Sequence, residues 1–173
     1  GAAAALVRQA VNSSIPQVIV PDAEAALLTF GAMTRADYDG ILVGITGSAG
    51  KTTAKNMLAE ILSRAGKVVA TTGNQNNELG VPLTLAGLNR QHQFAVIEMG
   101  AGQPDDIAYL CDVAEPDIAV CLNASAAHLA HFDSVDAIAR TKGEIFQGLK
   151  GEGLAVINAD QPWLSQWIQQ AGG

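Results

Sequence analysis

Apolar residues in this chain gather in short runs that alternate with segments of helical periodicity. Five runs rich in branched side chains predict strands at 41–45, 67–71, 94–98, 117–122 and 154–158. Between them, apolar residues recur every three or four positions, as on the buried face of a helix. Because strands separated by helices pair in parallel, the pattern predicts an α/β fold with a three-layer, open, mostly parallel sheet.

Capping residues indicate where several of these helices begin and end. Asp22 is the expected N-cap of a helix that runs from Ala23 to about Met33. Gly66 is the expected C-cap of the helix that follows the first predicted strand of the sheet. Asp133 or Ser134 caps a later helix whose apolar face carries Val135, Ile138, Ile145 and Phe146.

Residues 1–20 carry no chemical motif. They begin with an alanine-rich stretch that predicts a helix and end with an extended segment at 16–20. The opening lacks the basic region and long apolar core of a signal peptide. The chain also has no initiator Met, so we interpret it as an excised fragment.

Composition bounds the class of protein. A chain of 173 residues with 49% hydrophobic and 16% charged residues can form one sizeable domain with a core, together with a remnant of another. The net charge of −7 argues against general nucleic-acid binding, and no apolar run reaches the about 18 residues of a membrane span. Cys111 and Cys121 stand in apolar surroundings without metal-ligand spacing, which predicts buried free thiols in a reducing compartment.

The strand at 41–45 runs into the segment Gly47-Ser-Ala-Gly-Lys-Thr-Thr53, which has the features of a phosphate-binding loop. Glycines allow a tight turn whose N–H groups face an anion at the start of the next helix. Lys51 supplies a positive charge, and the Thr52 hydroxyl can ligate Mg²⁺. The general pattern has glycine where this chain has Ile45. A simple tight connection would not explain a lysine and two threonines at the helix start.

Two further strand ends carry polar side chains. The loop after the second strand contains Asn74, Asn76 and Asn77, which are either turn formers or amides that face a ligand. The third strand ends in Glu98, at the edge where parallel sheets bind ligands. Glu98 is therefore a candidate magnesium ligand, and the alternative is a carboxylate in water at the sheet edge.

Histidine and lysine residues near the fourth strand are weaker candidates. His128 and His131 follow that strand, but two histidines three apart are a weak metal signal, and a lone histidine is more often a core or surface residue. Lys142 lies one turn before Phe146 on the predicted helix, so it points partly inward. A buried amine is costly unless it is paired or modified, and the alternative is a surface lysine beside Glu144.

These motifs, taken together, resemble the Mur ligases over residues 16–160. The resemblance rests on six segments in order: 46–53, 73–77 with 80–82, 98–101, 128–129, 142–146 and 158–160. It accounts for Ile45, because this family uses the shorter glycine pattern. Gly102-Gln103-Pro104 departs from the Asn-His that related sequences often carry after Gly-Ala.

The resemblance implies an ATP-dependent amide ligase of peptidoglycan precursor synthesis that acts through an acyl phosphate. The asparagine loop with Gly-Val-Pro-Leu-Thr-Leu is most similar to members that join D-alanyl-D-alanine to UDP-N-acetylmuramoyl-tripeptide. By the same resemblance, residues 1–20 are the end of an N-terminal UDP-sugar domain and 21–173 an incomplete central ATP-binding domain, with the C-terminal domain absent. We expect a cytoplasmic monomer, and no ligation by these residues alone.

The resemblance also implies roles for individual residues. Residues Gly47, Ser48, Ala49, Gly50, Lys51, Thr52 and Thr53 would bind ATP. Thr52 and Glu98 would hold one Mg²⁺, while His128 and a carbamylated Lys142 would support a second. Lys51, Glu98, His128 and Lys142 would be catalytic, and Asn74, Asn76 and Asn77 would contact the substrate.

Two alternatives stay open at the level of sequence. One is a sister ligase of the same family or of the folylpolyglutamate synthetase type, which would use another amine. The other is a nucleotide-binding switch or motor without ligase chemistry. The Asn74–Asn77 loop argues against the first alternative.

Overall fold

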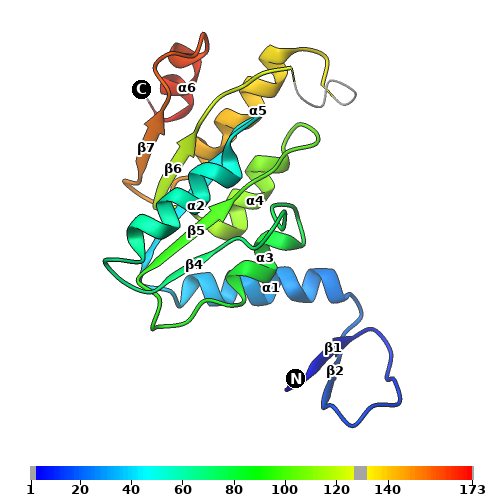
Figure 1. Ribbon diagram of the computed structural model, residues 1–173. Helices are drawn as coiled ribbons and strands as arrows, with labels where there is room; N and C mark the ends of the chain where they lie inside the picture. The colour runs from blue at the N-terminus through cyan, green and yellow to red at the C-terminus, as the bar shows by residue number, and fades with distance from the viewer. Residues whose placement is uncertain (1–2, 127–131, 173) are drawn as a thin grey trace.

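A computed structural model describes residues 3–126 and 132–172, and it centres on a five-stranded parallel sheet (Figure 1). The strand order is β4-β5-β3-β6-β7, and every pairing in this sheet is parallel. The strands are β3 (Ile41–Thr46), β4 (Val68–Ala70), β5 (Phe94–Glu98), β6 (Ile118–Cys121) and β7 (Leu154–Ile157). The predicted α/β class and the positions of all five strands are confirmed.

Helices cover both faces of the sheet unequally. On one face lies α2 (Lys51–Leu62), and the other face carries α1 (Ala23–Ala36), α3 (Gly80–Leu85), α4 (Asp106–Ala114), α5 (Val135–Gln147) and α6 (Leu164–Gln170) (Figure 1). The connection from β3 to β4 runs toward the β4 edge of the sheet. The later connections, from β4 to β5, β6 and β7, run toward the β7 edge. Because such crossovers are right-handed, the connecting helices fall on opposite faces.

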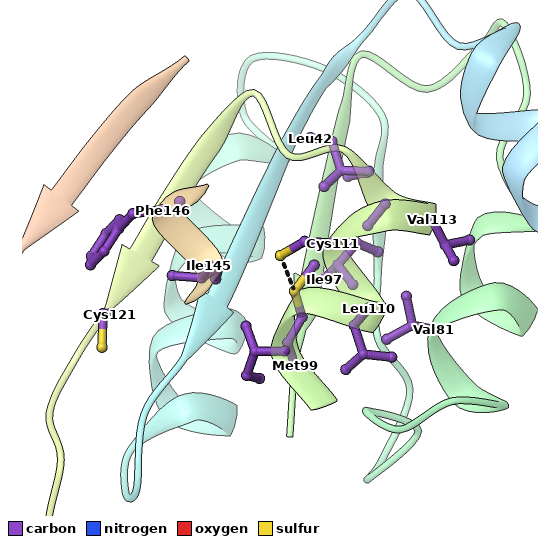
Figure 2. Packing of buried hydrophobic residues seen from close by; sticks show 14 of the residues in the cluster. Leu42, Val81, Ile97, Met99, Leu110, Cys111, Val113, Cys121, Ile145 and Phe146 are labelled. Atoms are coloured by element: carbon purple, nitrogen blue, oxygen red, sulfur yellow. Dashed lines mark hydrogen bonds between the residues drawn. The ribbon is translucent and has the colours of Figure 1, made fainter. Parts of the chain in front are cut away.

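The larger core lies between the sheet and the helices of the more heavily covered face. Figure 2 shows this core, in which Leu42 of β3 and Ile97 of β5 pack with Leu110 of α4 and Ile145 of α5. Cys111 and Met99 face each other in this core, with their sulfur atoms 3.8 Å apart. Cys111 and Cys121 are both buried free thiols, as predicted.

The predicted helix starts are confirmed, and one predicted helix end is wrong. The Asp22 carboxylate accepts hydrogen bonds from the N–H groups of Glu24 and Ala25, and the Ser134 hydroxyl accepts one from Ala137. The helix expected to end at Gly66 stops at Leu62. Gly66 instead donates its N–H to the Leu62 carbonyl at 3.0 Å and closes the turn that follows the helix.

The expected helix near the N-terminus is also wrong within the described residues. Residues Ala5–Val7 form β1, which pairs in parallel with β2 (Gln17–Ile19). The Ala5 N–H donates to the Pro16 carbonyl at 2.8 Å, so pairing with a distant segment overrides the local helical preference of alanine. This small sheet lies apart from the main one, beyond the start of α1 (Figure 1).

Helix α1 is held to the domain at two places. A Cβ atom on Gly31 would lie 3.0 Å from the Pro82 backbone, so glycine allows α1 and α3 to pack closely. Arg35 is buried and donates to the carbonyls of Ala114 and Glu115 and to the Asp117 carboxylate, at 2.7 to 3.1 Å. Both contacts join the N-terminal helix to α3 and α4 on one face of the sheet.

Candidate functional site

Residues that follow three strands, β3, β4 and β5, meet at one end of the sheet, because parallel strands present all their carboxyl ends on the same side. A cavity of about 430 Å³ lies at this end. Its lining comes from the loop after β3, the loop after β4, the turn after β5, α4 and α5. The lining residues are Gly47, Ser48, Lys51, Asn76, Asn77, Glu78, Gly100, Ala101, Gly102, Asp106, Tyr109, Leu110 and Lys142.

The predicted phosphate-binding loop stands between the central strand β3 and α2. Gly50 occupies the N-cap of α2 with φ of 82°, a left-handed conformation that favours glycine. The Lys51 ammonium turns back to donate to the Gly47 carbonyl at 2.7 Å. The loop therefore has the glycine turn, the helix start and the lysine that an anion site requires.

Glu98 makes a direct contact with the helix that follows this loop. Its Oε2 accepts a hydrogen bond from the Thr52 hydroxyl at 3.0 Å, and its Oε1 accepts one from the Asn76 side chain at 2.8 Å. Glu98 is only 2% exposed, and β5 lies inside the sheet between β4 and β3. The interpretation of Glu98 as a carboxylate in water at a sheet edge is therefore wrong.

The three asparagines of the loop after β4 have different environments. Asn76 orients Glu98, and Asn77 lines the cavity while its side-chain oxygen accepts a hydrogen bond from the Gly80 N–H at 3.0 Å. Asn74 does not line this cavity but is exposed beside a separate hollow that α1 and α3 border. Thus the structure brings two of the three residues to the cavity, and one of these also forms a turn.

Lys142 reaches the cavity from α5 and is 4% exposed, so the interpretation as a surface lysine is wrong. Burial lowers the pKa of Lys142 to about 8, and the positive charge of Lys51 contributes to the same shift. A large part of such an amine is neutral near pH 8. Neutral amines are nucleophiles, so Lys142 has the protonation state that modification requires.

Glu144 does not pair with Lys142, although the two residues are close in sequence. Its carboxylate accepts hydrogen bonds from the N–H groups of Asp105 and Ala108 at 3.2 and 3.0 Å. These groups stand at the start of α4, whose own N-cap residue Asp105 makes no side-chain cap bond. Desolvation raises the pKa of Glu144. Glu144 thus joins α5 to α4 beside the cavity.

His128 and His131 lie outside the described residues, so their predicted roles stay predictions. Within residues 3–126 and 132–172, no three side chains among His, Cys, Asp and Glu are grouped to hold a metal ion. The Thr52 hydroxyl and Glu98 carboxylate are nevertheless hard oxygen donors in contact with each other. Such donors suit Mg²⁺, which in nucleotide sites usually takes one or two protein ligands together with phosphate oxygens and water.

Two buried polar residues near the site have little signal in the sequence. Lys55, one turn after Lys51, is 4% exposed and donates to the Thr71 carbonyl at 2.6 Å. The Thr71 hydroxyl accepts a hydrogen bond from the Glu98 N–H at 2.9 Å. Lys55 thus holds Thr71, and Thr71 holds the backbone of Glu98. Only the helical spacing of Lys55 from Lys51 indicates that both lysines lie on one side of α2.

Comparisons with known proteins agree with this geometry. Residues 45–173 match the Mur ligase middle domain family. The chain is 42% identical over 166 residues to the UDP-N-acetylmuramoyl-tripeptide–D-alanyl-D-alanine ligase of Escherichia coli K12, covering 95% of this chain and 37% of that protein. It therefore spans little more than a third of the length of this curated relative.

Solved structures give the same result. A crystal structure of MurF from Acinetobacter baumannii matches 99% of this chain and 38% of its own, with a TM-score of 0.89 and 36% identity. MurF from Thermotoga maritima, solved in complex with ADP, matches 99% of this chain and 40% of its own, with a TM-score of 0.84 and 37% identity. No helix in the described ranges is long and apolar enough to cross a membrane.

Proposed function

The chain belongs to the Mur ligase family, and on this premise we propose that it provides the ATP-binding part of a ligase. The proposed ligase joins D-alanyl-D-alanine to UDP-N-acetylmuramoyl-tripeptide, as the printed names of its relatives state for those proteins. The observation that carries the proposal is the Thr52–Glu98 contact, which Asn76 links to the cavity that Lys51 also lines. A tight connection without function would need none of these side chains.

The proposed reaction has two steps. A carboxylate oxygen of the muramoyl peptide attacks the γ-phosphorus of ATP, and the bond to the β-phosphate oxygen breaks to give an acyl phosphate and ADP. The amine of D-alanyl-D-alanine then attacks the acyl carbon, so that an amide forms and phosphate leaves with loss of one proton. Both steps bring negative groups together, so neutralising charge is the main requirement.

The residues of the loop and of β5 meet this requirement in the proposal. Backbone N–H groups at the start of α2 bind phosphate oxygens, and the Lys51 ammonium exchanges its present acceptor, the Gly47 carbonyl, for a phosphate. Thr52 and Glu98 hold Mg²⁺, which offsets the phosphate charge when bound. Asn76 keeps the Glu98 carboxylate turned toward Thr52 through its own hydrogen bond.

Lys142 and His128 have proposed roles at a second Mg²⁺. The neutral Lys142 amine would attack CO₂ to form a carbamate with release of one proton, which replaces a buried ammonium by oxygen ligands. The lowered pKa of Lys142 and its place in the cavity wall support this modification. Asn74 and Asn77 stay proposed substrate contacts, and Asn74 would act from the neighbouring hollow.

Other features of the whole protein are proposed on the same premise. Residues 1–20 would end a UDP-sugar domain, and the separate β1–β2 sheet supports a boundary near Val20. We also propose a cytoplasmic monomer that requires no nucleic acid.

The test is ADP release by a ligase of full length that carries these residues. Assays contain ATP and Mg²⁺ with neither, one or both of the two peptide substrates. We expect sustained release only with both substrates, together with an amide product. Equal release without either substrate would indicate a nucleotide switch, and release with a different amine would indicate a sister ligase. Amide formation by the 173-residue chain alone would contradict the proposal that other parts of the protein supply the amine site.

A further inference from the structure

The segment that leaves β6 is joined to the phosphate-binding loop by hydrogen bonds in both directions. The Ser48 N–H donates to the Asn123 carbonyl at 3.0 Å, and the Ala49 N–H donates to the Asn123 side-chain oxygen, also at 3.0 Å. In return, the Asn123 Nδ2 donates to the Ala49 carbonyl at 3.1 Å. The side chain of Asn123 thus bonds to both the N–H and the carbonyl of Ala49.

Ser125 repeats the arrangement two residues later. Its N–H donates to the Ser48 hydroxyl at 2.9 Å, and that hydroxyl donates to the Ser125 carbonyl at 3.3 Å. The approach is close because residue 47 has no side chain, and a Cβ atom there would lie 3.1 Å from the Leu122 Cβ. The pairing of β3 with β6 therefore continues past the strand ends into the loop.

These contacts divide the backbone N–H groups of the loop into two sets. Those of Ser48 and Ala49 already have acceptors on Asn123. The first intrahelical bond of α2 runs from Ala54 to Gly50, so the N–H groups of 51–53 have no acceptor within the helix. Among the described residues, none of these three groups donates to another acceptor in the structure. The Gly50 N–H also has no acceptor among the described residues, so the N–H groups of 50–53 are the ones available to an anion.

We propose that Asn123 is a positioning residue of the nucleotide site, which holds the loop so that the N–H groups of 50–53 converge on phosphate. This proposal rests on the proposed function. It assigns the N–H groups of Ser48 and Ala49 to holding the loop instead of to binding phosphate. A side-chain amide can donate and accept at once, whereas a carboxylate cannot donate. Fixing the loop before the nucleotide arrives lowers the ordering cost of binding, so Asn123 raises affinity without touching the ligand.

The experiment compares Asn123→Ala with Asn158→Ala in the ligase of full length that carries these residues. Asn158 is a matched control because its Nδ2 also donates to a backbone carbonyl, that of Leu122 directly after β6 at 2.8 Å, but does not contact the loop. The first measurement is the affinity for ATP with Mg²⁺ by calorimetry. We expect Asn123→Ala to weaken binding by about tenfold or more and Asn158→Ala by about twofold or less. Equal affinity of Asn123→Ala and the wild type would overturn the proposal.

The second measurement is residue-resolved hydrogen exchange without nucleotide. We expect protected amides at Ser48 and Ala49 in the wild type. In Asn123→Ala we expect faster exchange at Ala49, whose side-chain acceptor is removed, and unchanged exchange in the sheet. Rapid exchange of both amides in the wild type would contradict the proposal. This measurement decides the loop-holding role even if the wild type binds no ATP, which would instead count against the proposed function.

A second variant, with a smaller change, tests the proposal if Asn123→Ala does not fold. Ser48→Ala removes only the hydroxyl that bonds to Ser125. We expect a loss of ATP affinity of about threefold, with an unchanged unfolding midpoint. A loss of stability in this variant without any loss of affinity would show that the contacts serve folding alone and would contradict the proposal.

Discussion

The Thr52 hydroxyl donates to Glu98 at 3.0 Å, although 46 residues separate the two in the sequence. One residue stands in the first turn of α2 and the other at the end of β5. The contact forms because β5 lies beside β3, so the end of β5 meets the helix that begins after β3. The pairing of β3 with β5 thus brings a hydroxyl and a carboxylate oxygen together.

A Glu98→Gln substitution tests whether this pair binds Mg²⁺. The amide has nearly the same shape but no negative charge, so it is a much weaker magnesium ligand. We expect the affinity for ATP measured with Mg²⁺ to fall by about tenfold or more, and the affinity measured with EDTA to be unchanged. Glu152→Gln, at an exposed position before β7, serves as the control and should change neither value.

Replacing Lys142 by methionine should stabilise the fold near neutral pH. The unfolded amine has a pKa of 10.5 and the folded one about 8, so below pH 8 the folded state carries a buried charge at a cost of about 3 kcal/mol. This cost diminishes between pH 8 and 10.5 and disappears above that range. Lys142→Met should therefore raise the unfolding free energy most at pH 7.

Urea unfolding in CO₂-free buffer at pH 7, 9 and 10.5 measures this effect. Lys150→Met is the control, because Lys150 is exposed and forms only a surface ion pair with Glu115, 3.5 Å away. Its stability should stay within about 0.5 kcal/mol of the wild type. A gain for Lys142→Met that is the same at every pH would show that packing, and not the charge, is responsible.

Tyr38→Phe should leave stability unchanged or raise it by about 1 kcal/mol. The Tyr38 hydroxyl is buried and, within the described residues, has no hydrogen-bond partner. Burial also raises the pKa of Tyr38 to about 12, so the group is neutral at physiological pH. Removing an unpaired hydroxyl deletes a desolvation cost without loss of a bond. A decrease of the urea midpoint would reveal a partner, with Tyr109→Phe at an exposed position as control.

Both thiols should be unreactive in the folded protein. Burial raises the pKa of Cys111 and of Cys121 to about 12, while each unfolded thiol titrates near 9.0. A disulfide reagent at pH 8.5 should therefore modify neither cysteine until urea is added. Because the unfolded chain loses these protons first, stability should fall as pH rises from 9 to 12, by about 1.4 kcal/mol per pH unit for each thiol. Serine at both positions should flatten that profile.

Local patterns predicted most of the fold and several residues of the candidate site. Runs of branched residues placed the strands, and the caps Asp22 and Ser134 placed two helix starts, because both features act within a few residues. Glu98 and Lys142 were candidates because each stands at a fixed offset from an apolar pattern, and the structure shows that both are buried. Gly66 was misjudged because α2 ends a turn earlier, at Leu62, with Ser63 as its C-cap residue.

Contacts between distant segments could not be predicted in this way. The β1–β2 pairing replaced an expected helix, since hydrogen bonds to residues 16–19 outweighed local preference. Asn123 and Ala49 are 74 residues apart, and an asparagine after a strand is an ordinary turn residue when considered alone. Only the register of β3 with β6 makes it a partner of the loop.

The order of strands in the sheet also has a consequence for synthesis. β3 is the middle strand, but its neighbours β5 and β6 follow it on the chain after intervening elements. A ribosome therefore releases the phosphate-binding loop well before Glu98 and Asn123 emerge to meet it. Since distant pairings must close large loops, we expect the loop to lack both partners until β6 has left the exit tunnel.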